Sequence, residues 1–217
     1  MLHNQIMSRN NRASSSKVSH KPKGRREINK QATHQAIIRA ARKLFAKNGY
    51  ANTPLEAVVR LAKVTTGAVY DHFGDKKRLF CAVAEGVEAE IMQRLAAATH
   101  DAGDPWSRLV IGTMAMLEIC SEPDIRQIVF VDAPNVIGAA EWYAIEVRYS
   151  YGVMCETLSE LMAAGEIRAA PVEMLAPMLL GALIAAANNV ALADDSAAAL
   201  PAAREAASIF LQALRIR

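Results

Sequence analysis

The sequence predicts an all-α protein of about nine helices, in which an N-terminal three-helix unit is followed by a larger helical domain. Three observations lead to this fold class. Apolar residues recur at the three- to four-residue spacing of amphipathic helices. No stretch shows the sustained alternation that is typical of strands. Alanine, which has the highest intrinsic helix propensity, is abundant after residue 160.

Capping signals place the first two helices. The first is expected over residues 30–48 and ends before Gly49, a residue type that favours helix C-termini. The second begins where Thr53 can serve as the N-cap, Pro54 fits the first turn and Glu56 completes a capping box. This second helix is short and is expected to stop near residue 63.

A third short helix can be capped by Thr65 or Thr66 and is expected to end near Tyr70. Val69 and Phe73 share one face of this segment and should pack against the first two helices, at Leu44, Phe45, Val58 and Leu61. Thr66 and Tyr70 share another face and should point outward. Two small residues would let the backbone approach a phosphate or a base edge: Gly67 and Ala68. Three such helices with a tight second turn describe a helix-turn-helix unit, which binds double-stranded DNA.

Helix starts and breaks divide the rest of the chain. Asp75 is expected to cap a linking helix over residues 76–98, which joins a helix-turn-helix domain at 27–80 to a second domain at 100–217. The later helices are expected at about 105–120, from 123, at 139–164, at 172–193 and at 201–214, with a break at 133–135 and with Pro171 and Pro201 as helix starts.

Charge is distributed unevenly along the chain. Residues 1–80 hold 17 Lys and Arg against four acids, a net charge of +13, whereas residues 81–217 carry a net charge of −10. A basic segment on an acidic body indicates that the basic part meets a polyanion, although a solvated basic surface is the alternative. Residues 1–26 have no regular apolar spacing, and we expect a disordered basic tail, either simply solvated or acting as an arm on DNA.

Several other classes of protein find no support in the sequence. The three cysteines are widely spaced and form no CxxC pair, which disfavours a zinc site or a disulfide framework and fits a reducing cytoplasm. The histidines have no metal-ligand spacing, and neither a phosphate-binding glycine-rich loop nor a GxSxG motif is present. We therefore expect no enzyme activity, no cofactor and no metal.

A membrane location is also disfavoured. No apolar stretch of signal-peptide length follows the first residue. Residues 174–193 contain no charge and are long enough to span a bilayer, but alanines dominate them and Pro177, Gly181, Asn188 and Asn189 interrupt them. Close packing between helices is the interpretation that we favour for this segment.

The run from Thr65 to Phe80, TTGAVYDHFGDKKRLF, resembles the signature of the tetracycline-repressor (TetR) family of bacterial regulators. Upstream, AARKLF at 40–45 and NGYANT at 48–53 are similar to the first helix and the following turn of the same family. The similarity covers residues 30–80, about a quarter of the chain. It departs from the family pattern at Asp71, where many members carry an aromatic or neutral residue, and this puts the base preference in doubt.

The resemblance implies roles in DNA binding by position. Thr53 and Lys76 would bind phosphates, Lys76 with help from the dipole of its helix. His72 would meet the DNA backbone. The remaining positions would face the major groove or its flanking phosphates: Thr65, Thr66, Gly67, Ala68 and Tyr70. The alternatives are that the threonines only cap helices and that His72 is a packed hinge residue.

For residues 100–217 the resemblance implies a domain that binds a small-molecule effector and forms a homodimer. Its last two helices would pair with those of a second copy in a four-helix bundle, for which Gly181, Ala182, Ala185 and Ala186 permit close approach; a core within one chain is the alternative. An aromatic and methionine-lined pocket between the middle helices would hold a hydrophobic or aromatic effector. Its expected lining residues are Trp106, Met114, Met116, Asp132, Asn135, Trp142, Tyr143, Arg148, Tyr149, Tyr151 and Asn188.

Overall fold

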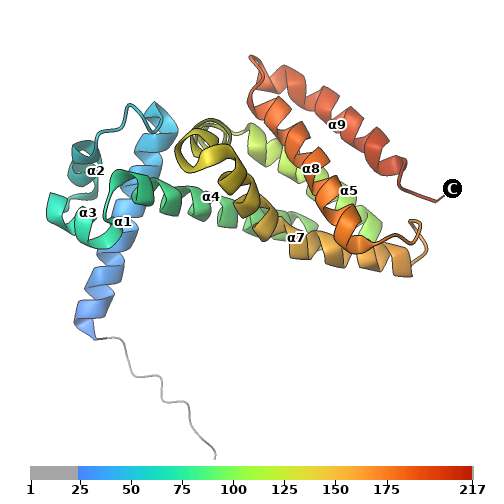
Figure 1. Ribbon diagram of the computed structural model, residues 1–217, viewed down its shortest axis with the longest axis horizontal. Coiled ribbons are helices and arrows are strands. Elements are labelled where there is room, and N and C mark those ends of the chain that lie inside the picture. The colour runs from blue at the N-terminus through green and yellow to red at the C-terminus, as the bar shows by residue number, and fades with distance from the viewer. Residues whose placement is uncertain (1–23, 217) are drawn as a thin grey trace, which may run out of the picture.

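The computed structural model describes residues 24–216, and within this range it contains helices and no strands (Figure 1). Most of the expected basic tail therefore lies outside the described residues. Arg25 and Arg26, which the sequence analysis placed in that tail, form the first turn of α1 (Arg25–Asn48). The first two turns of α1 project beyond the rest of the N-terminal unit, and their side chains are exposed (Figure 1).

The N-terminal unit, which we call the head, consists of α1, α2 (Leu55–Ala62) and α3 (Thr66–Phe73), followed by the start of α4 (Lys76–Thr99). Its core is aromatic at the centre: the rings of Phe45 and Phe80 meet edge to face with centroids 5.3 Å apart, and both side chains are fully buried. Val69 and Phe73 anchor α3 on this core as expected, whereas Leu61, assigned to the same contact, is 43% exposed.

Local capping determines how the head helices end and begin. Gly49 takes a φ of +76° at the end of α1, a backbone conformation that residues other than glycine rarely adopt. The Thr65 hydroxyl accepts a hydrogen bond from the Ala68 N–H, and the Asp75 carboxylate accepts one from the Arg78 N–H. These are the caps that the sequence predicted for α3 and α4.

The second domain, which we call the body, contains α5 (Pro105–Ser121), α6 (Pro123–Ile125), two π-helical segments, α7 (Ala139–Ala163), α8 (Val172–Ala191) and α9 (Ser196–Gln212). The π-helical segments are η1 (Arg126–Asp132) and η2 (Pro134–Gly138). In Figure 1, α4 runs from the head into the body, and the C-terminal end of the chain lies at the far side from the head.

Four expected helix boundaries were wrong, and the first of these is the start of α1, which lies at Arg25 and not at residue 30. The chain does not break at Pro134: residue 133 keeps helical angles, and the wider π turns accommodate the proline until Gly138, with a φ of +117°, redirects the backbone. Pro201 lies inside α9 rather than at its start, because Asp195 caps the helix earlier through the Ala198 N–H. In addition, α3 continues one turn past Tyr70 to Phe73.

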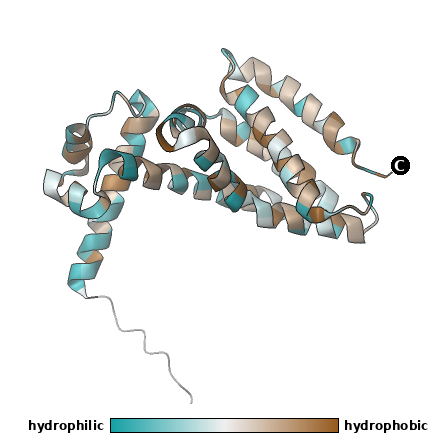
Figure 2. Ribbon diagram, viewed as in Figure 1, coloured by the Kyte–Doolittle hydropathy of each residue, from teal (hydrophilic) through white to brown (hydrophobic). Residues whose placement is uncertain are grey.

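The helix α8 is long and apolar enough to cross a membrane by length and composition alone. It packs against α5, α7 and α9, and its apolar character is visible in Figure 2. Leu179 and Leu183 are buried in a core shared with Leu158, Leu161 and Leu211. These contacts are those of a core helix within the chain, in agreement with the packing interpretation of the sequence.

Candidate DNA-binding face and ligand cavity

The outer face of α3 is exposed and consists of small and hydrogen-bonding residues. Thr65, Thr66 and Gly67 are exposed at its N-terminus, and Tyr70 is 53% exposed one turn later. Asp71 is exposed beside it. A helix anchored by two buried side chains that presents an unobstructed polar face has the form of a recognition helix, which enters a major groove by its N-terminal residues. Ala68, also expected at the interface, is half-buried.

Thr53 does not belong to this face, and its predicted phosphate contact is wrong for this conformation. The residue is completely buried, and its hydroxyl donates to the Gly49 carbonyl oxygen at 2.8 Å. The Leu44 carbonyl oxygen lies 3.2 Å from the same hydroxyl. Thr53 also does not cap α2, whose N-cap position is Pro54 without a side-chain cap. Its role is to fasten the end of α1 to the following turn.

His72 and Lys76 are half-buried, and both side chains contact aromatic rings. The His72 ring centroid lies 5.5 Å from that of His34 on α1, and the His34 ring stacks on Phe73 at 4.6 Å. The ammonium nitrogen of Lys76 sits 4.2 Å above the centre of the Tyr50 ring. Burial lowers the pKa of Lys76, and the charge of Asp132 opposes that effect.

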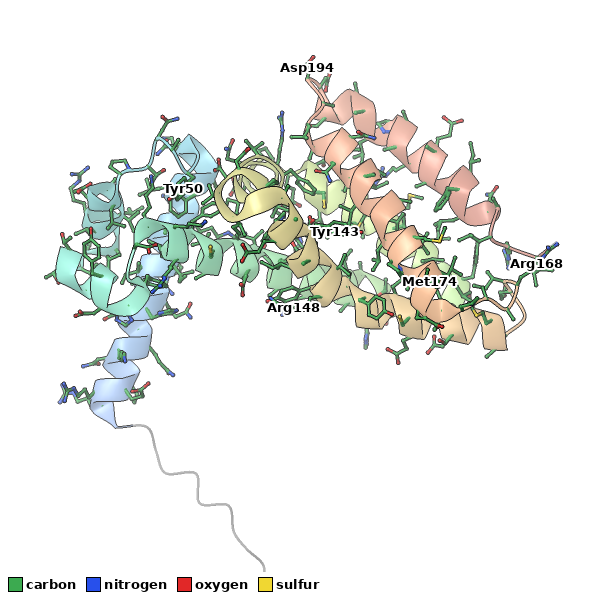
Figure 3. The ribbon with its side chains drawn as sticks, viewed as in Figure 1. Tyr50, Tyr143, Arg148, Arg168, Met174 and Asp194 are labelled. Carbon is green, nitrogen blue, oxygen red and sulfur yellow. The ribbon has the colours of Figure 1, made fainter. Side chains whose placement is uncertain are left out.

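The head and the body are joined through Asp132, which lies at the end of η1. Its carboxylate accepts a hydrogen bond of 2.8 Å from the Tyr50 N–H. Figure 3 places Tyr50 at the turn after α1, next to the start of α4. A second contact ties α1 to the linking helix: Arg42 of α1 forms a two-pronged ion pair with Glu90 of α4. Asp132 was expected in the ligand pocket, and this assignment was wrong: it connects the two domains.

A cavity of about 460 Å³ lies within the body between α4, α5, α7 and α8. Its volume falls within the usual range for small-molecule sites. The walls are mainly apolar, with Met92, Leu95, Met116, Met154, Leu180 and Leu183 among them. Thr113 contributes a buried hydroxyl that has no hydrogen-bond partner, and Arg108 lines the cavity while paired with Glu160 at 2.6 Å. The arrangement suits a largely apolar molecule with a few polar contacts.

Most of the residues expected to line a pocket lie elsewhere. Of that set, Tyr149 and Met116 line the cavity. Trp142 is buried in the core, Met114 packs at the edge of that core, and Trp106 lies beneath the Arg215 guanidinium at 4.9 Å. The side-chain amides of Asn135 and Asn188 donate to carbonyl oxygens of their own helical turns, at Val131 and Ile184. The others do not line the cavity: Tyr143, Arg148 and Tyr151 (Figure 3 labels the first two). The Tyr143 hydroxyl lies against Gly181 of α8.

Two buried acids lie beside this cavity, Glu88 of α4 and Glu146 of α7, and neither was among the residues expected from the sequence. Burial raises the pKa of Glu88 to about 7. Burial, and then the charge of Glu88, raise the pKa of Glu146 to about 8. Helical spacing could have revealed Glu88, because it lies four residues after Ala84 and three before Ile91, on the inward face of α4.

Together these features define a class of protein: a helix-turn-helix DNA-binding regulator with an all-helical ligand domain. Residues 37–83 match the family described as bacterial regulatory proteins, tetR family. Residues 106–214, half of the chain, match the tetracyclin repressor-like C-terminal domain. The chain belongs to the TetR family of bacterial transcriptional regulators, whose members are DNA-binding proteins and not enzymes.

Individual relatives agree with this membership. A crystal structure of a TetR-family transcriptional regulator from Pectobacterium atrosepticum superposes with a TM-score of 0.80 at 33% identity, over 88% of this chain and 97% of that chain. The transposon Tn10 TetC protein of Escherichia coli is 27% identical over 73% of this chain and 80% of its own length. The transcriptional repressor BepR of Brucella suis is 35% identical over 45% of this chain and 47% of its own length.

Proposed function

We propose that this regulator is a ligand-responsive cytoplasmic repressor, which binds a palindromic operator as a homodimer and releases it when a small, largely apolar effector occupies the body cavity. The observation that carries the proposal is the course of α4. One uninterrupted helix begins at Lys76, directly after the recognition helix, and lines the cavity with Met92, Leu95 and Thr99 near its other end. A molecule in the cavity therefore touches the same rigid element that positions the head.

In the DNA complex, we assign base and phosphate contacts to the exposed face of α3. Tyr70 and Thr66 would reach into the major groove, and the exposed backbone around Gly67 would approach the DNA closely. Lys76 would leave the Tyr50 ring to bind a phosphate, and His72 would meet the backbone at the edge of the groove. This assignment is supported by the exposure of Thr66, Gly67 and Tyr70 and by the net positive charge of the head, where 12 Lys and Arg of residues 24–80 oppose four acids.

Release would be transmitted through two connections between head and body. The first is α4 itself, and the second is the hydrogen bond from Tyr50 to Asp132 at the end of η1. An effector that binds better to one spacing of the two heads shifts the population towards that spacing. Operator affinity then falls by the ratio of the effector affinities for the two arrangements, without any direct contact between effector and DNA.

The dimer interface is assigned to α8 and α9, where each helix leaves a row of small and apolar residues exposed. On α8, Met174 and Met178 are 62% and 69% exposed, and Leu192 continues the row (Figure 3 labels Met174). On α9, Ile209 is 64% exposed. Such rows at helical spacing permit the close contact of a four-helix bundle between two copies.

The dimer assignment can be tested by Met178→Glu. A charge placed in the interface should convert the protein to monomers in light scattering at micromolar concentration. Ile28→Glu, at a 55% exposed apolar position on α1, is the matched control and should leave the oligomeric state unchanged. Monomers from the control, or an intact dimer for Met178→Glu, would place the interface elsewhere.

The DNA-binding part is tested by selection of the full chain on random duplex DNA at two salt concentrations, followed by sequencing of the retained pool. We expect a palindrome whose half-sites lie about one helical turn, or a multiple of it, apart. Tyr70→Ala should abolish the enrichment without lowering stability. Tyr143→Ala is the control, because Tyr143 is exposed to a similar degree (43%) but lies in the body. Retention without an enriched sequence would refute operator recognition.

The effector part is tested with the enriched duplex. A library of small hydrophobic compounds is screened for compounds that raise the melting temperature, and each one found is titrated into the protein–operator complex. A true effector should weaken operator binding at least tenfold at saturation. If no compound that occupies the cavity changes operator affinity, the protein is a regulator without ligand control, and this part of the proposal fails.

A further inference from the structure

A second, smaller cavity of about 40 Å³ adjoins the large one, and it is lined by both buried acids, Glu88 and Glu146. Met92, Leu95, Met116 and Ser150 line both cavities, so the two spaces share a wall of side chains. A volume of this size has room for about three water-sized groups, since a single water needs about 10–15 Å³ of such space.

Both acids are buried, and among the described residues neither forms a salt bridge. Glu88 and Glu146 are 6% and 8% exposed, and Oε2 of Glu88 has no hydrogen-bond partner. No hydrogen bond joins the two carboxyl groups among the described residues. The Trp142 indole N–H lies beside Glu146 and lowers its pKa, but this effect is smaller than that of burial. An unpaired buried charge costs several kcal/mol, so such groups stay protonated or acquire a cation.

The neighbouring elements supply no cation for this site. Around the pair lie the buried Cys120 thiol from α5, Ser150 from α7, and apolar residues from η1 and α8. The nearest cation that the electrostatics record is Arg94 of α4, which acts on Cys120 and not on the two acids. Arg94 is occupied by a two-pronged ion pair with Glu122. Within residues 24–216 no group of three or more His, Cys, Asp or Glu side chains could hold a metal ion. Two carboxylates facing one small cavity, without a third ligand, match a protonated amine better than a metal.

We propose that the effector is an amphiphilic organic cation, whose protonated amine enters the small cavity between Glu88 and Glu146 while its apolar body fills the large one. The proposal rests on the proposed function, because it takes the large cavity as the effector site. The ammonium group donates hydrogen bonds to the two carboxylates, and these charge-assisted contacts are stronger than those of a neutral group. The apolar walls of methionine and leucine accept many shapes of hydrocarbon or aromatic ring.

Binding of an amine should change the protonation of the two acids, and the protons released can be measured. Without a ligand, both carboxyl groups are largely protonated at pH 6.5, since burial raises the pKa of Glu88 to about 7 and that of Glu146 to about 8. Entry of an ammonium group favours the ionised carboxylates, and each carboxyl that ionises releases one proton to the buffer. A neutral ligand of the same shape releases none.

The test compares 4-phenylbutylamine, which is charged below about pH 10 as an alkylamine, with 4-phenylbutanol as a neutral match. Calorimetric titration of the full chain at pH 8.5 should give at least tenfold tighter binding of the amine, and the preference should shrink several-fold at pH 5.5. At pH 6.5, amine binding should release protons, seen as different heats in two buffers of unlike ionisation enthalpy. The alcohol should show neither effect.

Three variants assign the preference to this site. Glu88→Gln and Glu146→Gln, alone and together, preserve side-chain shape and remove the charge, and the double variant should bind both compounds within twofold of each other. Glu85→Gln removes a half-exposed charge from the same helix, outside both cavities, and should keep the preference. Circular dichroism melting verifies that each variant is folded.

The outcomes separate this proposal from the proposed function. Equal binding of the two probes, binding of neither, or an amine preference that survives in the folded double variant would overturn the cation proposal. The proposed function would then stand if another library compound still releases operator DNA, and it would fail with the proposal if no compound does. If the amine binds with the expected preference and pH dependence but does not weaken operator binding, the cation site is confirmed and its role as an effector site is refuted.

Discussion

Thr53→Val separates a structural role of the threonine from a contact with DNA. The substitution keeps the branched shape and removes the hydroxyl that donates to the Gly49 carbonyl oxygen at 2.8 Å. The lost hydrogen bond contributes about 0.5–1.5 kcal/mol, and leaving a buried acceptor without a partner adds to the loss. We expect the free energy of unfolding to fall by about 1–2 kcal/mol. For a chain of this size that corresponds to a decrease of roughly 2–8 °C in Tm.

The assay combines urea unfolding with operator binding by fluorescence anisotropy, on the duplex enriched by selection. At a temperature where both proteins are folded, Thr53→Val should bind the operator like the unsubstituted chain, with the same dependence on salt. Thr66→Val is the matched control: Thr66 is exposed on the outer face of α3, so stability should change by less than about 0.5 kcal/mol while operator affinity falls. Unchanged stability for Thr53→Val, with weaker binding and a salt slope reduced by about one, would instead assign Thr53 to a phosphate.

Three further predictions follow from the junction, the buried acids and the glycines. Asp132→Ala should lower the free energy of unfolding by about 1–3 kcal/mol, because the Tyr50 N–H loses a charged acceptor. Hydrogen exchange of the Tyr50 amide should become faster, and unchanged exchange would contradict the contact. Burial raises the pKa of Glu88 to about 7, so its folded form binds a proton more tightly than the unfolded chain does and stability falls as pH rises from about 4.5 to 7. Glu88→Gln should flatten that slope in urea unfolding across pH 5–8, and an unaltered slope would place the titration elsewhere. Gly138→Ala should lower the free energy of unfolding by about 1–3 kcal/mol, since the φ of Gly138 is +117°. Gly152→Ala should raise it by up to about 1 kcal/mol, because Gly152 lies within α7 and a Cβ there meets no other atom. Equal changes in Tm for the two variants would refute the argument from backbone strain.

The all-α class and the head could be predicted because their determinants are local. Thr65 and Asp75 cap helices by accepting hydrogen bonds from N–H groups three residues ahead. Gly49 takes a positive φ, which residues with a side chain rarely adopt. The inward and outward faces of α3 follow from helical spacing alone, so Val69 was correctly assigned to the core and Tyr70 to the surface. Such signals lie within one helical turn and do not depend on the rest of the molecule.

Standard helix signals failed at two positions. Pro134 reads as a helix breaker, but the π-helical turns around it leave room for a residue without an N–H. Thr53 reads as an N-cap, but folding turns its hydroxyl back onto α1. The acceptors of the Thr53 hydroxyl lie four and nine residues back, at Gly49 and Leu44, whereas the capping rule considers only the helix that follows.

The ligand cavity and the domain junction were determined by tertiary structure alone. Periodicity identifies which side chains point inward, but it cannot show which of them meet a partner and which are left facing a space. Thus Met92 and Leu183 line the cavity, while Trp142 fills the core. The Asp132 carboxylate accepts a hydrogen bond from the Tyr50 N–H, 82 residues away in the chain, only because η1 packs against the head. The sequence by itself determined most of the helices and the exposed face of α3, because both depend on contacts within a few residues. The packing of α4, α5, α7 and α8 decided where the cavity lies.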